Sequence, residues 1–178
     1  MNTNPETAAF PLDHLAIGKD PEASALVTRS GTLTYKMLNH RVGLLAAWLQ
    51  GQGMVRGDRV ATWLSKTELA CLMPLAAARA GLVHVPVNPL LKHLQVAHIL
   101  GDSGARLMIS NAGRLKTLDG IDIPEACNLF EDRAVEEAVA TLITAVEPSA
   151  ATTDTGELVA ILYTSGSTGR PKGVMLSH

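Results

Sequence analysis

The sequence contains few of the residues that mark metal-binding, disulfide-rich or nucleic-acid-binding proteins. Only two of its 178 residues are cysteines, and neither Cys71 nor Cys127 belongs to a Cys-x-x-Cys pair or has a histidine at ligand spacing. We therefore predict no metal site and interpret both cysteines as small hydrophobic residues in a reducing compartment. The formal net charge of −2 lacks the basic excess that binds a phosphate backbone, so nucleic acid is not an expected partner.

The sequence also lacks a secretory leader and a long uninterrupted apolar run. Its first residues show no basic segment followed by an apolar one. The most apolar stretch, residues 69–87, is interrupted by Pro74, Arg79 and His84, whereas a membrane-spanning helix needs about 20 largely apolar residues. We therefore predict a cytoplasmic protein without a transmembrane segment, in which residues 69–87 form a core helix followed by a buried strand.

The composition that remains is typical of a folded globular protein. Hydrophobic residues make up 47% and charged residues 18% of the chain, a balance that disfavours wholesale disorder. Residues 1–30 show scattered proline, glycine and charge with little periodicity, and we interpret them as a lead-in segment on the domain surface.

Helical and strand patterns alternate from Leu33 onward. Amphipathic spacing or helix-favouring composition predicts helices at about 33–51, 66–80, 92–101, 113–118 and 132–144. Short apolar runs predict strands at about 59–64, 82–87, 106–110, 127–130, 157–163 and 174–176. This alternation predicts an α/β fold with αβα layers around a largely parallel sheet. Residues 148–156 are predicted to be a surface connection between two units of sheet.

The segment Thr164–Gly173 (TSGSTGRPKG) has the composition of a phosphate-binding loop. Its glycines let the backbone approach an anion with successive N–H groups, its hydroxyls add donors, and Lys172 neutralises oxyanions. It is not a Walker A loop, because Pro171 precedes the lysine and a strand follows where that motif has a helix. The alternative is a glycine-serine linker, which needs neither the Arg-Pro-Lys ending nor a strand on each side.

A resemblance to a known family is carried by the segment YTSGSTGRPKGVMLSH. It is similar to the signature phosphate-binding motif of the AMP-forming adenylating superfamily, which includes acyl-CoA synthetases, nonribosomal-peptide adenylation domains and luciferases. Further similarity lies upstream, in LTYKMLNH, GMVRGDRVA and AGLVHVPVNPLLKHLQVAHILGDSGARLMIS. The resemblance implies a lead-in of residues 1–30 and a partial adenylation domain of residues 31–178, which ends after the phosphate-binding loop.

The resemblance also implies a reaction and its binding residues. A carboxylic acid would be activated by ATP as an acyl-adenylate, with release of pyrophosphate, and then passed to coenzyme A. The residues implied to bind the β- and γ-phosphates of ATP are Thr164, Ser165, Gly166, Ser167, Thr168, Gly169 and Lys172. Mg²⁺ is implied as a cofactor, with its ligand and the catalytic residues expected beyond His178. We assign no metal ligand within the chain.

The histidines are interpreted as structural residues. His178 ends the motif, but a lone histidine without a visible partner is more often structural than a catalytic base. His84, His93 and His98 are not interpreted as ligands, because His93 and His98 do not share a helical face.

The resemblance leaves most family motifs unaccounted for in the 178 residues. The motifs for adenine, ribose, Mg²⁺, the acyl pocket and the mobile domain with a catalytic lysine do not occur. We therefore expect a fragment of a longer enzyme, or a truncated product, that is inactive alone. The strand Glu157–Tyr163 is expected to pair with strands outside this chain, which would leave an aggregation-prone apolar edge.

Three functional hypotheses follow. The first is an acyl-CoA synthetase, favoured over an amino-acid-activating adenylation domain because no carrier domain is visible and PVNPLLKHLQVAHIL resembles medium- or long-chain acyl-CoA ligases. The second is a non-catalytic nucleotide- or phosphate-binding module. The third, a structural or interaction remnant without a ligand, fits least well with the intact loop.

Overall fold

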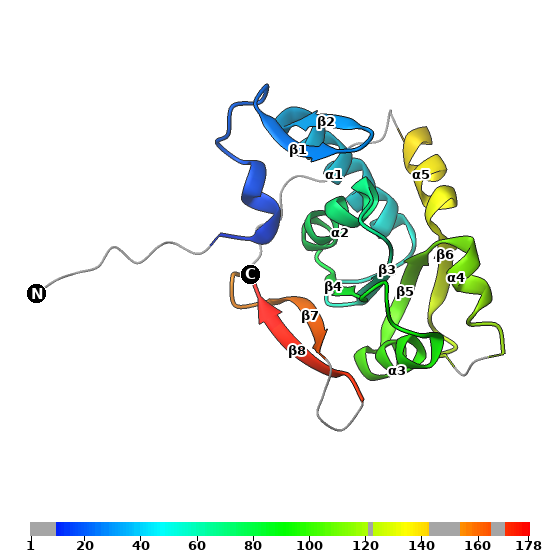
Figure 1. The fold of residues 1–178 in the computed structure, drawn as a ribbon. Coiled ribbons are helices and arrows are strands. Elements are labelled where there is room, and N and C mark those ends of the chain that lie inside the picture. The colour runs from blue at the N-terminus through cyan, green and yellow to red at the C-terminus, as the bar shows by residue number, and fades with distance from the viewer. Residues whose placement is uncertain (1–9, 121–122, 143–153, 165–169) are drawn as a thin grey trace, which may run out of the picture.

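A six-stranded sheet forms the centre of the molecule (Figure 1). The computed structural model describes residues 10–120, 123–142, 154–164 and 170–178. In spatial order the strands are β6 (Asn128–Glu131), β5 (Ala105–Ser110), β3 (Arg59–Trp63), β4 (Val83–Pro86), β7 (Leu158–Thr164) and β8 (Lys172–Ser177). Every neighbouring pair is parallel except β7 and β8, which are antiparallel. The predicted largely parallel sheet is therefore confirmed.

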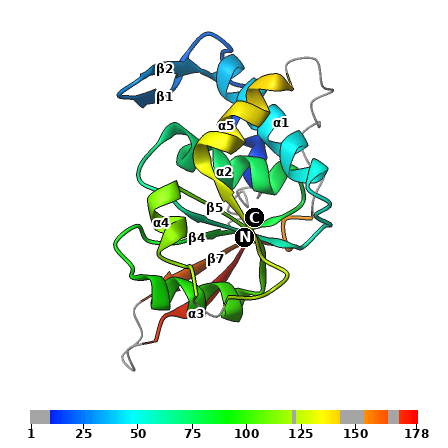
Figure 2. The ribbon, with the colours of Figure 1, turned by 90° about the vertical axis from the view of Figure 1, so that its right-hand side faces the viewer.

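Helices cover both faces of this sheet (Figure 2). They are α1 (Tyr35–Gly51), α2 (Glu68–Arg79), α3 (His93–Ser103), α4 (Ala112–Lys116) and α5 (Asp132–Thr141). One hydrophobic cluster packs α1, α2 and α5 on one face and includes Leu45, Met73 and Val135. The second packs α3 on the other face and includes Val85 and Ile99. The predicted αβα layering is confirmed. No helix in the described ranges is long and apolar enough to cross a membrane.

Local signals in the sequence explain where the helices begin and end. The hydroxyl of Thr34 accepts the N–H of Met37 at the start of α1, and the hydroxyl of Thr67 accepts that of Ala70 at the start of α2. Such caps contribute about 1 kcal/mol each. Helix α3 ends at Gly104, whose φ of 62° is left-handed and costs glycine little.

The described part of the lead-in segment is more structured than its composition predicts. It contains a 3₁₀ helix, η1 (Leu12–Ala16), and the strand β1 (Ser24–Thr28), which pairs with β2 (Gly31–Thr34) in a separate antiparallel sheet. Strands this short leave little period-two signal. The amphipathic pattern from Leu33 begins in β2, so the helix starts at Tyr35.

The expectation that β7 pairs with strands outside this chain is wrong, because both neighbours of β7 in the sheet belong to this chain. Strand β7 lies between β4, which it meets at His84 and Ala160, and β8, which it pairs along its length. The connection 148–156 therefore leads back into the same sheet, not into a second unit, and residues 148–153 lie outside the described ranges. On this side of the sheet the edge strand is instead β8, where Val174, Met175 and Leu176 are exposed.

A buried ion pair fastens η1 to α2. The Arg79 guanidinium lies 3.5 Å from Oδ2 of Asp13 and also donates to the Asp13 carbonyl at 3.3 Å. It donates further to the carbonyl and the side-chain oxygen of Asn39, at 3.1 and 2.9 Å. Arg79 is 6% and Asp13 1% exposed, so both charges have left water and depend on each other for compensation.

A buried histidine pairs with a hydroxyl inside the sheet. His84 Nε2 on β4 lies 2.9 Å from Oγ1 of Thr62 on β3, and both residues are buried. Burial lowers the pKa of His84 from 6.5 to about 4. The folded protein therefore keeps this ring neutral at a pH where the unfolded chain binds a proton, so stability is present above pH 6.5 and is lost as the pH falls toward 4.

Replacing His84 with glutamine should remove this pH dependence, because the amide can pair with Thr62 but does not titrate. Between pH 7 and pH 5 the free energy of unfolding should fall by about 2 kcal/mol more in the unsubstituted chain than in His84→Gln. Urea unfolding at the two pH values measures this difference. Equal losses in both proteins would contradict the assignment.

Candidate functional site

The two ends of the predicted phosphate-binding loop meet in the antiparallel pair β7 and β8. Thr164, the last residue of β7, lies opposite Lys172, the first residue of β8. Five of the predicted site residues lie outside the described ranges, namely Ser165, Gly166, Ser167, Thr168 and Gly169. The two strands predicted on either side of these residues are confirmed.

The pairing places the hydroxyl and the ammonium group on one face of the sheet. Residues directly opposite each other in an antiparallel pair share a face, so Thr164 and Lys172 leave the sheet on the same side. Both are exposed. Because side chains alternate along a strand, Tyr163 and Ile161 lie on the opposite face, where Ile161 joins the hydrophobic cluster of α3.

The absence of a side chain at Gly173 leaves room for the ring of Tyr163 to lie across the β7–β8 pair. A Cβ atom added at Gly173 would lie 2.9 Å from Cγ2 of Ile161 and 3.2 Å from Cζ of Tyr163. A side chain would therefore collide with the core side chain of β7. This close approach requires the final glycine of the TSGSTGRPKG motif, independently of any phosphate.

Helix α3 contacts the polypeptide on both sides of the loop. The hydroxyl of Tyr163 donates to Oδ2 of Asp102 at 2.6 Å. Nε2 of His98 lies 3.2 Å from the carbonyl oxygen of Pro171, which can only accept, so Nε2 carries the hydrogen. Burial and the Asp102 carboxylate raise the pKa of Tyr163 above its ordinary value. The phenol therefore remains a donor at neutral pH.

A small cavity of about 310 Å³ lies beside the start of β8. Its lining comes from α3 and from the residues before β8, namely Leu94, Gln95, His98, Arg170 and Pro171. Arg170 is exposed. A second cationic side chain, that of Arg170, therefore lines this cavity two positions before Lys172 in the sequence. Among the described residues no three His, Cys, Asp or Glu side chains are grouped closely enough to hold a metal ion.

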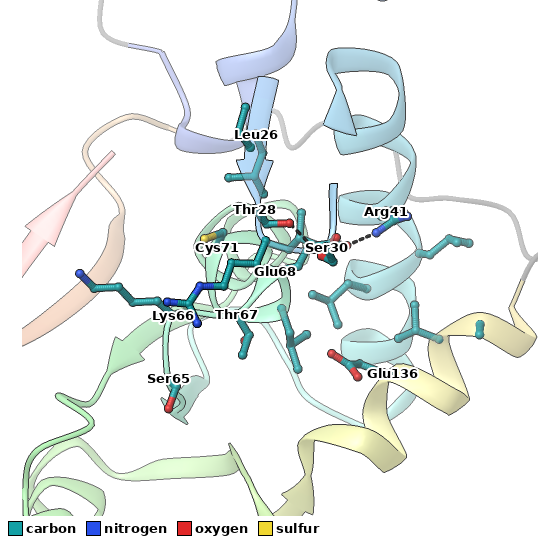
Figure 3. A pocket seen from close by; sticks show the side chains of 18 of the residues that line it. Leu26, Thr28, Ser30, Arg41, Ser65, Lys66, Thr67, Glu68, Cys71 and Glu136 are labelled. Atoms are coloured by element: carbon teal, nitrogen blue, oxygen red, sulfur yellow. Dashed lines mark hydrogen bonds and ion pairs between the residues drawn. The ribbon is translucent and has the colours of Figure 1, made fainter. Parts of the chain in front are cut away.

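A larger cavity, of about 1330 Å³, lies elsewhere, among β1, α1, α2 and α5 (Figure 3). Arg41 of α1 and Glu68 of α2 form an ion pair there, and Cys71 lines the same cavity. Figures 1 and 2 show that β1 and α5, which contribute to its lining, lie toward the opposite end of the molecule from the β7–β8 pair. The cavity contains none of the residues predicted to bind phosphate.

His178 has a structural contact. Its Nδ1 accepts the backbone N–H of Leu12 at 2.9 Å, which ties the end of β8 to η1. Burial lowers the pKa of His178 below its ordinary value, which favours the neutral ring that can accept this bond. The interpretation of His178 as a structural residue is in agreement with this geometry.

Sequence reasoning missed the contacts of Tyr163, His98 and Asp102. The available signal was helical spacing, because His98 and Asp102 are four residues apart and share a face of α3. That spacing indicates a polar face on α3 but not the partner that it contacts.

The chain is similar to proteins of known function over most of its length. The family described as AMP-binding enzyme matches residues 14–178. The L-proline--[L-prolyl-carrier protein] ligase of Pseudomonas fluorescens is 34% identical over 173 residues, covering 92% of this chain and 33% of the relative. The fatty acid--[acyl-carrier-protein] ligase ScoC of Streptomyces coeruleorubidus is 34% identical over 180 residues, covering 100% of this chain and 33% of the relative.

Solved structures show the same architecture. ATP-bound MatB from Rhodopseudomonas palustris superimposes with a TM-score of 0.82 at 28% sequence identity, covering 94% of this chain and 35% of that one. The chain therefore spans about one third of the length of each of these three proteins.

Proposed function

Since the chain belongs to the AMP-binding enzyme family, we propose that residues 164–173, the phosphate-binding segment, bind the triphosphate of ATP in an enzyme that forms acyl-adenylates. The observation that carries this proposal is the pairing of Thr164 with Lys172, which places a hydroxyl and a cation on one face at the mouth of the loop. In the proposal Ser165, Gly166, Ser167, Thr168 and Gly169 complete the binding residues. The relative MatB, whose structure contains ATP, supports the choice of nucleotide.

The proposed reaction joins a carboxylate to the α-phosphorus of ATP. A carboxylate oxygen forms the new bond to phosphorus, the bond from the α-phosphorus to the bridging oxygen breaks, and pyrophosphate leaves with that electron pair. Lys172 would hold the β- and γ-phosphates in line and stabilise the charge that develops on the departing pyrophosphate. Mg²⁺ supplies further charge neutralisation when bound. We propose, from the resemblance to the family, that its protein ligand lies beyond His178.

The relatives indicate only the chemical classes of the acid and of the thiol acceptor. One relative is named for proline and another for a fatty acid, and both names give a carrier protein as the acceptor. The relatives therefore do not favour an acyl-CoA synthetase over an amino-acid-activating enzyme. We propose a carboxylic acid as the substrate and the thiol of coenzyme A or of a carrier protein as the acceptor. We place the reaction in the cytoplasm, where ATP and coenzyme A are available.

Two measurements on the same protein test the proposal. Isothermal titration calorimetry should detect binding of Mg·ATP, with pyrophosphate as a competitor because the segment contacts the β- and γ-phosphates. Carboxylate-dependent exchange of labelled pyrophosphate into ATP, assayed with a panel of amino and fatty acids, measures adenylation. Binding with exchange supports the enzyme. Binding without exchange supports the phosphate-binding role of the segment, and it is the result expected of a chain that is inactive alone. Failure of a folded protein to bind ATP would overturn the proposal.

A further inference from the structure

We propose that His98 and Asp102 are positioning residues that hold both strands of the β7–β8 pair against α3, and thereby set the place of Lys172. The inference rests on the proposed function, because it gives these residues a part in ATP binding. They do not touch the phosphates themselves. They act through Tyr163 at the end of β7 and Pro171 before the start of β8.

Helix α3 is a suitable reference because it is fixed to the sheet. Val96, Ile99 and Leu100 are each 0% exposed in the cluster between α3 and the strands. At the other end of the helix, Nε of Arg59 on β3 donates to the Ser103 carbonyl at 2.8 Å. Its Nη2 donates to the carbonyl that follows at 2.7 Å. The last carbonyls of α3 are therefore held by the central strand of the sheet.

The contact with β7 is a short hydrogen bond to a charged acceptor. Tyr163 immediately precedes Thr164, and its hydroxyl is 2.6 Å from the Asp102 carboxylate. Hydrogen bonds with an ionised partner are about twice as strong as neutral ones. The ring fits only because Gly173 faces it across the strand pair. The bond thus fixes the position of β7 along the axis of α3, and with it the position of Gly173, the residue of β8 that faces Tyr163.

The contact with β8 orients the peptide unit that joins Pro171 to Lys172. Proline has no N–H, so the Pro171 residue can be held through its backbone only at its carbonyl. That carbonyl accepts the Nε2–H of His98 at 3.2 Å. The carbonyl and the N–H of Lys172 belong to one planar peptide unit. Holding the carbonyl therefore orients the first N–H of β8 and the Cα atom that carries the lysine side chain.

Placement of a phosphate-binding lysine matters because its contribution depends on distance and direction. Displacing a binding group by about 1 Å can cost on the order of 100-fold in rate. Loss of one of two contacts should allow a smaller displacement. We therefore expect each single loss to weaken Mg·ATP binding by about tenfold, and loss of both contacts to weaken it further.

Variants that keep or remove each hydrogen bond separate positioning from simple packing. His98→Ala and Asp102→Ala remove the bonds, whereas His98→Gln and Asp102→Asn keep a donor and an acceptor in similar places. Tyr163→Phe removes only the hydroxyl and keeps the ring. His93→Ala is the matched control, because it removes a histidine from the first turn of the same helix, away from the β7–β8 contacts.

Each variant is measured in two ways in addition to its melting temperature. Calorimetry gives the Kd for Mg·ATP, and hydrogen exchange by mass spectrometry, without nucleotide, gives the protection of β7 and β8. We expect the two alanine variants and Tyr163→Phe to bind about tenfold more weakly and to exchange faster in these strands. The glutamine, asparagine and control variants should stay within about threefold of the unsubstituted chain, a change below the tenfold positioning effect.

The outcomes distinguish this inference from the proposed function. If the unsubstituted chain binds ATP and the alanine variants bind it equally well, the positioning role is overturned and the proposed function stands. If the conservative variants lose as much affinity as the alanine variants, the hydrogen bonds are not responsible and the inference also fails. If the unsubstituted chain binds no ATP, the proposed function fails. Unchanged exchange in the alanine variants would then reject the positioning contacts as well.

Discussion

Replacement of Lys172 with alanine is expected to weaken Mg·ATP binding by about 10- to 100-fold, because a hydrogen bond to a charged group contributes about 1.5–3 kcal/mol. Lys172 is exposed at the start of an edge strand, so the substitution removes charge and removes little packing. The melting temperature should therefore change little. Calorimetric titration of the chain with Mg·ATP measures the loss directly.

The controls for Lys172 separate its position from its charge. Lys36→Ala removes an exposed lysine from α1 and should leave the affinity unchanged. Lys172→Arg keeps the charge but presents a planar fork, so it should bind with intermediate affinity. Higher salt should reduce the difference between the unsubstituted chain and Lys172→Ala, because exposed charges are screened. Equal affinities in Lys172→Ala and Lys36→Ala would reject the proposed role of the loop.

Replacement of Asp13 with alanine is expected to lower the free energy of unfolding by about 3–5 kcal/mol, the usual cost of leaving a buried charge without its partner. Arg79 would keep its two contacts with Asn39 and its hydrogen bond to the backbone carbonyl of residue 13, but would lose its contact with the Asp13 carboxylate. The segment η1, which holds the end of β8 through His178, should detach from α2 first. Urea unfolding followed by circular dichroism measures the change.

An exposed ion pair provides the comparison for this prediction. Arg56 and Glu157 are 2.5 Å apart with side chains 56% and 42% exposed, and Glu157→Ala should cost no more than about 1 kcal/mol. The double substitution of Asp13→Leu with Arg79→Met should recover much of the loss, because no charge then remains buried. Similar costs for Asp13→Ala and Glu157→Ala would show that burial does not govern the η1 contact.

The elements of the sheet were predictable because their signals are local. The caps at Thr34 and Thr67 and the stop at Gly104 are read from neighbouring residues. The errors concern weak or distant signals. The strands β1 and β2 are short, and the partners of β7 are decided by crossovers of many residues. The relatives also removed the preference for coenzyme A over a carrier protein.

The sequence by itself determined the α/β class and indicated residues 164–173 as the proposed phosphate-binding segment, because hydrophobic period and the clustering of glycine, hydroxyls and lysine are properties of adjacent residues. Only the tertiary structure decided that Thr164 faces Lys172, that α3 contacts Tyr163 and Pro171, and that Arg79 meets Asp13. Apart from the hairpin pair Thr164 and Lys172, these contacts join residues distant in the chain. Their geometry exists only after the layers have packed, so no local pattern encodes it.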